Sequence, residues 1–315
     1  MKIVLLESLG ISEERLNEYA RPLVEAGHTF RAYPKDMDVQ VQIERARDAD
    51  VIMIANMPLS GEVIRACRQL KFIDVAFTGV DHVDLEAARE CGVKVSNAAG
   101  YSTEAVAELA LCLMLSLLRN VPQVSERCRQ GGTKDGLVGS ELRDKTVGIV
   151  GAGAIGSRTA ELCHAFGCRV LGNKRHVTGR EPSFVEFVPL DDLLRRSDIV
   201  SLHCPLTSET ARLINADRIA LMKPGAYLVN TARGGVVDSQ ALADALREGR
   251  LAGAGVDVFE GEPPLATDHP LLQAPHVLAT PHVAFASHES MEARAAIVFE
   301  NIRCWMEGRQ QNVVL

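Results

Sequence analysis

The sequence predicts an α/β protein of two doubly wound domains, each built on a mostly parallel sheet. Apolar runs alternate with helical patterns along most of the chain, which is typical of parallel strands covered by helices. A G-x-G-x-x-G turn stands mid-chain, from Gly151 to Gly156, so a segment the size of a domain precedes it. At 315 residues, the chain is long enough for two such domains with substantial cores.

The segment before the glycine turn alternates between strand and helix patterns. We expect strands at residues 2–6, 29–33, 51–55, 72–77 and 93–96, and helices at 12–25, 39–49, 60–68 and 85–90. A long helix over residues 103–119 is apolar on all sides, so it must be buried on several of them, at an interdomain or subunit contact. A polar, glycine-rich loop over 129–140 then leads to the strand before the turn.

After the turn the same alternation continues to the last helix. The expected strands are residues 168–172, 198–203, 226–230, 254–258 and 277–279, and the expected helices are 190–196, 215–221 and 239–248. The final helix, over 287–307, is amphipathic and lies outside this pattern.

Composition excludes several classes of function. The net charge is −7 and no basic face is evident, which argues against nucleic acid or anionic membrane as partners. No apolar run is long enough to cross a membrane, and the first residues are too short and too quickly acidic for a signal peptide. The eight cysteines show no C-x-x-C spacing, so we expect buried free thiols in a reducing cytoplasm and neither disulfides nor a metal site.

The glycine turn has the chemistry of a dinucleotide site. It follows an apolar strand at residues 146–150 and opens a helix that continues over 157–166. Gly151 permits a tight turn, Gly153 lets a pyrophosphate approach the backbone, and Gly156 allows close packing of helix on strand. The phosphates would lie at the positive end of the helix. The alternative is a glycine-rich turn without a ligand, which the flanking strand and helix make the weaker interpretation.

Three loops after late strands carry the candidate catalytic residues Arg233, Glu262 and His282. Ligands of open α/β sheets lie beyond the carboxyl ends of the strands, so these loops can converge on one crevice. Arg233 offers a cationic fork to the carboxylate and carbonyl oxygen of a 2-oxo acid, and His282 a proton for the developing alkoxide. Glu262 beside the imidazole would favour its charged form. Taken singly, the three residues also fit an ion pair, a solvated turn and a packed loop.

The chain resembles the D-2-hydroxyacid dehydrogenases over essentially its whole length. The resemblance rests on the glycine turn, Ser201-Leu-His-Cys-Pro-Leu-Thr207, Met222-Lys-Pro-Gly225, Asn230-Thr-Ala-Arg-Gly-Gly-Val-Val-Asp238, Val256-Asp-Val-Phe-Glu-Gly-Glu-Pro263 and Thr280-Pro-His282. It implies two Rossmann-like domains, with the cofactor domain (residues 99–286) inserted into a flavodoxin-like substrate domain (1–98 plus 287–315). It also implies Arg233, Glu262 and His282 as the catalytic residues, with Glu262 preferred over Glu260 because the family's glutamate directly precedes proline.

The same resemblance assigns further contacts. The backbone N–H groups of Thr78, Gly79 and Val80 are expected to bind the substrate carboxylate, although a plain strand-to-helix turn fits these residues as well. Thr103 and Asp257 are expected near the nicotinamide, and His203 is expected to pack in the cofactor cleft. The full set of expected cofactor contacts is Gly151, Gly153, Ala154, Ile155, Gly156, Lys174, Arg175, Thr103, Thr231, Ala232 and Asp257.

The end of the strand after the glycine turn predicts which cofactor binds. NAD-dependent members carry an acidic residue there for the ribose hydroxyls, whereas this chain has Lys174 followed by Arg175, with Arg180 nearby. Such cations attract a 2′-phosphate, and two charged hydrogen bonds of roughly 1.5–3 kcal/mol each give about a hundredfold preference or more. We therefore expect NADP to be preferred over NAD; the alternative is a solvated surface loop.

The substrate is expected to be a small 2-oxo or 2-hydroxy acid. Residues 95–108 and 280–287 resemble the glycerate dehydrogenase (hydroxypyruvate/glyoxylate reductase) branch, although residues 131–136 lack that branch's tryptophan and Ala99 replaces a common proline. No regulatory domain follows Leu315, which argues against the longer phosphoglycerate dehydrogenases. D-Lactate, formate or phosphite oxidation and a non-catalytic dinucleotide-sensing corepressor remain alternatives. Pairing through the apolar helix at 103–119 predicts a homodimer.

Overall fold

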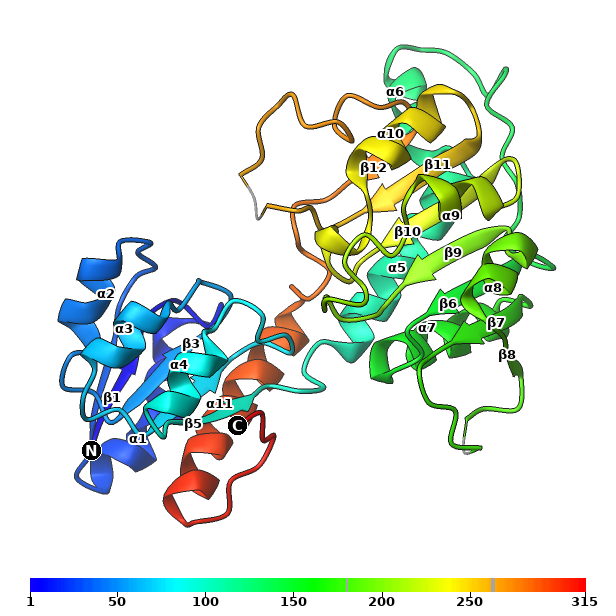
Figure 1. The fold of residues 1–315 in the computed structure, drawn as a ribbon. Coiled ribbons are helices and arrows are strands. Elements are labelled where there is room, and N and C mark those ends of the chain that lie inside the picture. Colours follow the sequence, from blue (N-terminus) through cyan, green and yellow to red (C-terminus); the bar gives the residue numbers. More distant parts are fainter. Residues whose placement is uncertain (180, 262–263) are drawn as a thin grey trace. The chain divides into compact units, whose positions relative to one another are not determined.

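The computed structural model describes residues 1–179, 181–261 and 264–315 (Figure 1). The chain divides into two compact units. Unit 1 comprises Met1–Ser102 and Ala286–Leu315, and unit 2 comprises Thr103–Phe285. Unit 2 is therefore inserted in the sequence of unit 1, whose last helix and tail come after it.

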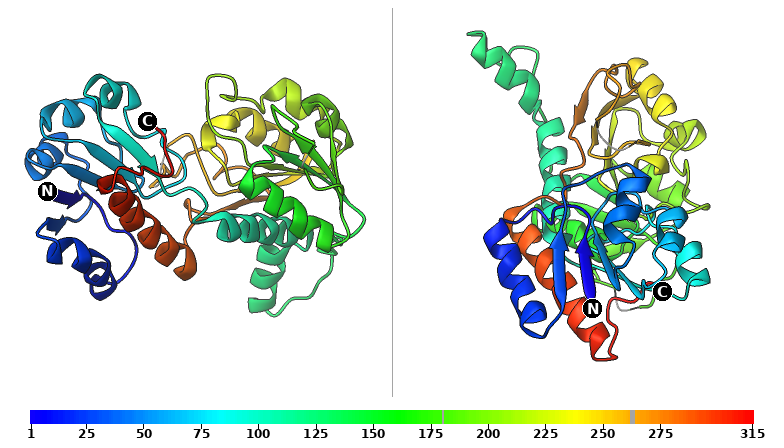
Figure 2. Two further views of the ribbon diagram at one scale, coloured as in Figure 1. Left: turned by 90° about the horizontal axis from the view of Figure 1, so that it is seen from below. Right: turned by 90° about the vertical axis from the view of Figure 1, so that its left-hand side faces the viewer.

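Unit 1 is a doubly wound parallel sheet with strand order β2-β1-β3-β4-β5. Helices α1 and α11 cover one face, and α2, α3 and α4 cover the other (Figure 2). This is the flavodoxin-like order, in which the direction of winding reverses between β1 and β3. The strands are β1 (Lys2–Leu5), β2 (Thr29–Ala32), β3 (Val51–Ile54), β4 (Phe72–Val75) and β5 (Lys94–Asn97); the helices are α1 (Glu13–Glu25), α2 (Val39–Ala46), α3 (Gly61–Ala66), α4 (Leu85–Glu90) and α11 (His288–Met306).

Local sequence explains the boundaries of these elements. The strands β3 and β4 are continuous apolar or buried runs, as central parallel strands covered on both faces must be. Ser12, Asp38 and Ser60 each cap the N-terminus of the following helix by accepting a backbone N–H. The C-terminal tail lies beside β5: the Val314 N–H donates to Val95 O at 2.9 Å, and Val313 pairs with Ser96 in antiparallel fashion. The tail thereby covers an edge of the sheet that would otherwise expose backbone groups.

Unit 2 is a seven-stranded parallel sheet with the order β12-β11-β10-β9-β6-β7-β8. The winding reverses between β6 and β9, as in other doubly wound nucleotide-binding sheets. The strands are β6 (Thr146–Val150), β7 (Arg169–Asn173), β8 (Val185–Phe187), β9 (Ile199–Leu202), β10 (Ala226–Asn230), β11 (Leu251–Val256) and β12 (Val277–Ala279); the helices are α5 (Thr103–Leu118), α6 (Val121–Arg129), α7 (Ala154–Ala165), α8 (Leu190–Arg196), α9 (Ala216–Leu221) and α10 (Ser239–Arg247), with a 3₁₀ turn η1 (Gly234–Val236).

The apolar helix α5 is buried largely within its own unit. It packs against α7 and across β10 and β11, where Gly255 leaves room for it: a Cβ at Gly255 would lie 3.0 Å from the Cβ of Leu113. One core cluster lies on this face of the sheet, among α5, α7 and the strands. A second cluster lies under α8, α9 and α10 on the other face. The predicted two-sided covering of a parallel sheet is confirmed.

One α-helix and one strand of unit 2 were not predicted. Helix α6 buries none of its residues and projects from the rest of its unit (Figure 2), so it has no apolar stripe to reveal it in the sequence. Strand β8 has only three residues and none of them is fully buried. Both lie at the margin of the unit, where few residues are buried. The sequence there therefore lacks the spacing of apolar residues that predicts a helix or strand.

Within the described residues, no single helix is long and apolar enough to cross a membrane; α5 and α6 reach that composition only as a pair bent by 61°. All eight cysteines are free thiols. Five of them are buried, whereas Cys91, Cys112 and Cys128 are exposed, so the expectation of buried thiols holds for most of them.

Candidate active site

The glycine turn lies at the point where the sheet of unit 2 reverses its winding. Gly151 follows β6 with a φ of +93°, and a Cβ there would lie 2.5 Å from the backbone nitrogen of Cys204, which follows β9. A Cβ at Gly156 would lie 2.2 Å from the carbonyl oxygen of Gly151. Both positions therefore exclude any side chain, as the dinucleotide fingerprint requires.

The residues at this turn fit a dinucleotide. A Cβ built at Gly153, the N-cap of α7, meets no atom of the described part of the chain within 4 Å, so the backbone is open to a ligand there. The first N–H groups of a helix have no partner within it, and in α7 they belong to Ala154 and Ile155. Beyond the neighbouring strands β9 and β10, His203 Nδ1 and Thr231 Oγ1 are buried and have no hydrogen-bond partner among the described residues. Open backbone donors and unsatisfied buried polar atoms at one edge of the sheet are typical of a ligand site.

Arg233 follows β10 in a turn that its neighbours hold. The Asn230 side chain donates from Nδ2 to Arg233 O at 3.0 Å and accepts the Ala232 N–H at Oδ1 at 3.1 Å. The Arg233 guanidinium donates to Ala232 O at 2.8 Å. The next residue, Gly234, leaves no room for a side chain, because a Cβ would lie 1.8 Å from the carbonyl carbon of Phe259. The local sequence thus sets the backbone of Arg233 at the end of its strand.

His282 follows β12 and is fixed by Asp257 from the end of β11. The fully buried Asp257 carboxylate accepts the Thr280 hydroxyl at 2.6 Å and the N–H groups of Val283 and Ala284 at 2.9 and 2.8 Å. The N–H of His282 itself donates to Asp257 O at 2.7 Å. His282 has a φ of +55°, which non-glycine residues rarely adopt and which tends to mark functional sites. Asp257 is therefore a positioning residue for His282, a role that the sequence did not suggest.

Of the two glutamates near β11, Glu260 is engaged elsewhere. Its carboxylate accepts the Ser239 hydroxyl at 2.7 Å and the Ser239 N–H at 3.3 Å, at the N-terminus of α10. His269 Nε2 lies 3.4 Å from the same carboxylate. Glu262, the predicted catalytic glutamate, lies outside the described residues.

Lys174 follows β7 and forms an ion pair that the sequence did not reveal. Its ammonium contacts the Glu181 carboxylate and lies 5.6 Å from the ring centroid of Phe187. Arg175 pairs with Glu209 at the surface. The third predicted cation, Arg180, lies outside the described residues.

Comparisons with known proteins identify the family. The NAD-binding domain of the D-isomer specific 2-hydroxyacid dehydrogenases matches residues 111–284, more than half of the chain. The chain belongs to this family. The predicted family, the α/β fold of two parallel-sheet domains and the assignment as a dehydrogenase are confirmed.

Several members of the family are similar in sequence to this dehydrogenase over most of its length. A glyoxylate reductase of Korarchaeum cryptofilum is 39% identical over 277 residues, which are 85% of this chain and 83% of the relative. A hydroxypyruvate reductase of Blautia hydrogenotrophica is 34% identical, covering 88% of each chain. A D-3-phosphoglycerate dehydrogenase of Methanocaldococcus jannaschii is 39% identical over 86% of this chain, which spans about half (53%) of that relative.

Solved structures agree with this fold. The TT0316 protein of Thermus thermophilus is 37% identical with a TM-score of 0.90, and an acyclic imino acid reductase in complex with NADPH and D-Arg is 30% identical with a TM-score of 0.91. Each match covers 100% of both chains. The family domain confirms a dinucleotide site of the NAD type, and the identity of the preferred coenzyme stays a prediction.

The remaining predicted residues of the dehydrogenase lie at strand or helix ends. Thr103 begins α5, and Thr231 and Ala232 lie between β10 and Arg233. The His203 side chain is half-buried: burial lowers its pKa to about 4, and its Nε2 lies 2.9 Å from Ser201 Oγ. It is therefore neutral at neutral pH, consistent with a packing role.

Thr78, Gly79 and Val80 belong to unit 1, after β4. Asn97 holds this loop by donating from Nδ2 to Thr78 O at 2.7 Å, and the Ala98 N–H donates to Phe77 O at 3.0 Å. Thr78 is exposed, and Gly79 and Val80 are half-buried, so the loop is accessible to a small ligand.

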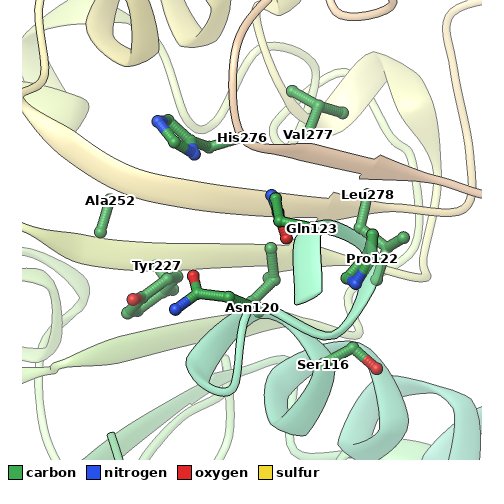
Figure 3. Close-up of a pocket in the computed structure, with 10 residues that line it drawn as sticks. Ser116, Asn120, Pro122, Gln123, Tyr227, Ala252, His276, Val277 and Leu278 are labelled. Atoms are coloured by element: carbon green, nitrogen blue, oxygen red, sulfur yellow. The ribbon is translucent and has the colours of Figure 1, made fainter. Parts of the chain in front are cut away.

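A pocket in unit 2 lies away from the carboxyl ends of the strands of that unit (Figure 3). It is bounded by Ser116, Asn120 and Gln123 around the junction of α5 and α6 and by Tyr227, Ala252 and His276 near the starts of β10, β11 and β12. The glycine turn, Arg233 and His282 follow the opposite, carboxyl ends of the strands. This pocket is therefore not the coenzyme site.

Proposed function

We propose that this dehydrogenase reduces hydroxypyruvate or glyoxylate to D-glycerate or glycolate, with NADPH preferred to NADH. The observation that carries the proposal is the His282 turn: a rare backbone conformation, held by a buried carboxylate, places an imidazole beyond the carboxyl end of the coenzyme-binding sheet. Arg233 lies at the same edge, two strands away. The reductase names of two similar relatives support the choice of substrate.

Arg233 binds the substrate in this proposal. Its guanidinium presents a planar fork of donors to the carboxylate and the carbonyl oxygen of a 2-oxo acid. The positive charge polarises the carbonyl and stabilises the developing alkoxide. The bound coenzyme supplies the hydride.

His282 transfers the proton. Its imidazolium donates a proton to the carbonyl oxygen of the substrate and, in the reverse direction, the neutral ring accepts the hydroxyl proton. Glu262 is proposed to favour the charged ring and to orient it. Asp257 holds the Thr280 side chain before His282 and the backbone after it, so the ring needs little reorganisation before the proton moves.

Lys174 and Arg175 are proposed to bind the 2′-phosphate of NADP. No carboxylate ends β7, so the repulsion that NAD-specific sites direct at a 2′-phosphate is absent from that described position. Gly151, Gly153, Ala154, Ile155 and Gly156 would hold the pyrophosphate, with Thr103, Thr231, Ala232 and Asp257 toward the nicotinamide end.

The test is kcat/KM for hydroxypyruvate and for glyoxylate, each with NADPH and with NADH. D-Lactate, formate and phosphite with the oxidised coenzymes serve as comparisons. We expect reduction of one of the two 2-oxo acids with NADPH preferred, and Lys174→Asp should shift the preference toward NADH. Faster oxidation of formate, phosphite or D-lactate would contradict the proposed substrate, and no turnover at all would favour a dinucleotide-sensing role.

Arg233→Ala tests the site. Loss of two charged hydrogen bonds of roughly 1.5–3 kcal/mol each should lower kcat/KM by at least about a hundredfold, while coenzyme binding survives. Arg196→Ala, which removes a surface partner of Glu186, is the matched control and should retain activity. Near-normal turnover in Arg233→Ala would refute the assignment.

We further propose that unit 1 binds the substrate through Thr78, Gly79 and Val80, and that the enzyme is a cytoplasmic homodimer. Helix α6 buries none of its residues, and Val121 and Val138 are 45% and 79% exposed, so this region offers an apolar surface to a second copy. Free thiols at all eight cysteines are typical of a reducing compartment. Sedimentation equilibrium should give twice the chain mass, and Val138→Glu should shift it toward the monomer; a monomeric wild type would refute the dimer.

A further inference from the structure

The loop after β7 forms an anion site, and the protein's own carboxylate occupies it. Glu181 accepts the N–H groups of Thr178 and Gly179, each at 2.7 Å, and the Thr178 hydroxyl at 3.0 Å. The Lys174 ammonium contacts the same carboxylate. Four donors from one short loop thus converge on a single anion, although Glu181 itself lies in the same loop.

The backbone of this loop is shaped for the purpose. Gly179 has a φ of +78°, and a Cβ there would meet no described atom within 4 Å. Glycine is therefore favoured at this position by its backbone conformation and not by a lack of room for a side chain. A left-handed residue next to a right-handed or extended one turns successive N–H groups to the same side, and such concave turns bind anions. The geometry of Thr178 and Gly179 therefore suits a phosphate oxygen as well as a carboxylate.

The charges of the site are partly withdrawn from water. The Glu181 side chain is 9% exposed and the Lys174 side chain 23%. The ammonium beside it, together with the Thr178 N–H, holds the pKa of the Glu181 carboxyl well below its usual range, so this carboxyl stays ionised at neutral pH. The Lys174 charge is therefore already compensated, and a second anion would have to replace Glu181 or share its donors.

Resting on the proposed binding of a 2′-phosphate by Lys174, we propose that Glu181 is a coenzyme-specificity residue whose carboxylate competes with the 2′-phosphate for the anion site formed by Lys174, Thr178 and Gly179. NADPH must release Glu181 to water before its phosphate gains these donors. NADH has no group for the site and leaves Glu181 in place. Glu181 thus lowers the preference for NADPH below the value that Lys174 alone would give.

The experiment measures binding without turnover. Isothermal titration calorimetry on the full chain gives the Kd of adenosine 2′,5′-bisphosphate and of 5′-AMP, which differ only by the 2′-phosphate, and then of NADPH and NADH. Glu181→Gln keeps the size and an acceptor oxygen but removes the charge. Because charge-assisted hydrogen bonds are about twice as strong as neutral ones, the neutral competitor should be displaced more easily. We expect about tenfold tighter binding of the bisphosphate and of NADPH, with the Kd of 5′-AMP and NADH unchanged.

Glu186→Gln is the matched control. Glu186 lies on the neighbouring strand β8 and pairs with Arg196 at 2.8 Å, so this variant makes the same change in net charge away from the anion site. This control should change the ratio of the Kd of 5′-AMP to the Kd of adenosine 2′,5′-bisphosphate less than twofold. An equal effect in both variants would show that net charge, and not competition, is responsible, and would overturn the proposal.

Two further outcomes would also overturn it. An unchanged bisphosphate Kd in Glu181→Gln would mean that the carboxylate does not compete, and weaker binding would mean that it positions Lys174 for the phosphate. Glu181→Ala, which removes the acceptor altogether, should tighten bisphosphate binding at least as much as Glu181→Gln.

Lys174→Ala separates this proposal from the coenzyme assignment. If this variant leaves the bisphosphate to 5′-AMP ratio unchanged, then Lys174 does not bind the 2′-phosphate and the coenzyme assignment fails. If it lowers the ratio while Glu181→Gln has no effect, then the coenzyme assignment stands and only the competition is refuted.

Discussion

The two units share an architecture but differ at the point where each sheet reverses its winding. In unit 2, Gly151 follows β6, and the backbone at Gly153 is open. In unit 1, β1 is followed by the buried Glu7, whose carboxylate accepts the N–H groups of Ala55 and Met57, beyond β3, at 2.8 and 2.7 Å. A carboxylate of the chain itself is thus bound at the reversal point of unit 1, where two backbone donors after β3 are already satisfied. Topology creates a reversal point in both units, and different residues stand there: Gly151 in unit 2 and Glu7 in unit 1.

Burial shifts the pKa of one polar group in each unit in opposite directions. Burial raises the pKa of Asp74, in β4 of unit 1, well above its usual range. Burial lowers the pKa of His203, in unit 2, to about 4. Both groups favour their neutral forms, so the contribution of Asp74 to stability should fall as pH rises and that of His203 should fall as pH falls.

The largest effect is expected from a substitution that disrupts the open glycine turn of unit 2. Gly151→Ala places a Cβ 2.5 Å from the Cys204 nitrogen and strains the backbone, so we expect a loss of about 4 kcal/mol in unit 2 and loss of NADH binding. Gly92→Ala in unit 1 is the control: φ is also positive, at +68°, but nothing lies within 4 Å, so about 1 kcal/mol is expected. Urea titration followed by hydrogen exchange in peptides of each unit measures both. Equal losses would show that the crowding at Gly151 does not matter.

The next effect tests the closed turn of unit 1. Glu7→Ala leaves the N–H groups of Ala55 and Met57 buried without an acceptor, which should cost about 3 kcal/mol, localised to unit 1. Glu7→Gln keeps an acceptor oxygen and should cost about 1 kcal/mol. The same exchange experiment reports the change, and a loss spread equally over both units would contradict the assignment.

A smaller effect follows from His203. Because its pKa in the folded protein is about 4, below the unfolded value of about 6.5, the unfolded chain binds the proton first. Stability from this group is present above pH 6.5 and is lost as pH falls toward 4, by about 2 kcal/mol between pH 7 and pH 5. The slope of the unfolding free energy of unit 2 between these pH values measures this. His203→Gln should flatten the slope, and an unchanged slope would assign the pH dependence to other groups.

The smallest effect comes from Asp74, with the opposite sign. Asp74 Oδ1 accepts from Asn301 Nδ2 at 2.9 Å, while its Oδ2 is buried with no hydrogen-bond partner in the ranges that the structure describes. Since the raised pKa keeps a proton that the unfolded chain releases, stability from this group is full at low pH and falls as pH rises. Asp74→Asn removes this loss but buries an amide without an acceptor, so we expect a net gain of about 1 kcal/mol at pH 8. Thermal unfolding at pH 5 and pH 8 should show the gain only at the higher pH.

Most elements could be predicted from the sequence because buried faces require apolar residues at regular spacing. The strands at Ala226–Asn230 and Val277–Ala279 and the helix at Leu190–Arg196 have the predicted bounds, since a parallel sheet covered on both faces needs apolar runs. The predicted helix 39–49 ends early, at Ala46 in α2. Helix α6 and strand β8 have little or no burial, and nothing in the sequence marked them.

The parts of the candidate site that could be predicted are those that depend on short sequence motifs. Glycine spacing and residue types after strands pointed to Gly151, Arg233 and His282, and the structure places each at the carboxyl end of a strand of one sheet. The support of these residues was not predictable, because it comes from other strands. The clamp of Asp257 on the His282 turn and the capture of Lys174 by Glu181 are contacts between segments that no short periodicity relates.

The sequence by itself determined the two parallel-sheet domains and the open glycine turn, because these follow from apolar periodicity and from positions where only glycine fits. The family followed from the resemblance of its ordered motifs to those of the D-2-hydroxyacid dehydrogenases. Only the tertiary structure decided which polar groups already have partners. Glu7 satisfies the backbone at the reversal point of unit 1, and Glu181 occupies the anion site of unit 2. A hydrogen bond depends on distances of a few tenths of an ångström between segments that the fold brings together, and residue order alone does not specify such distances.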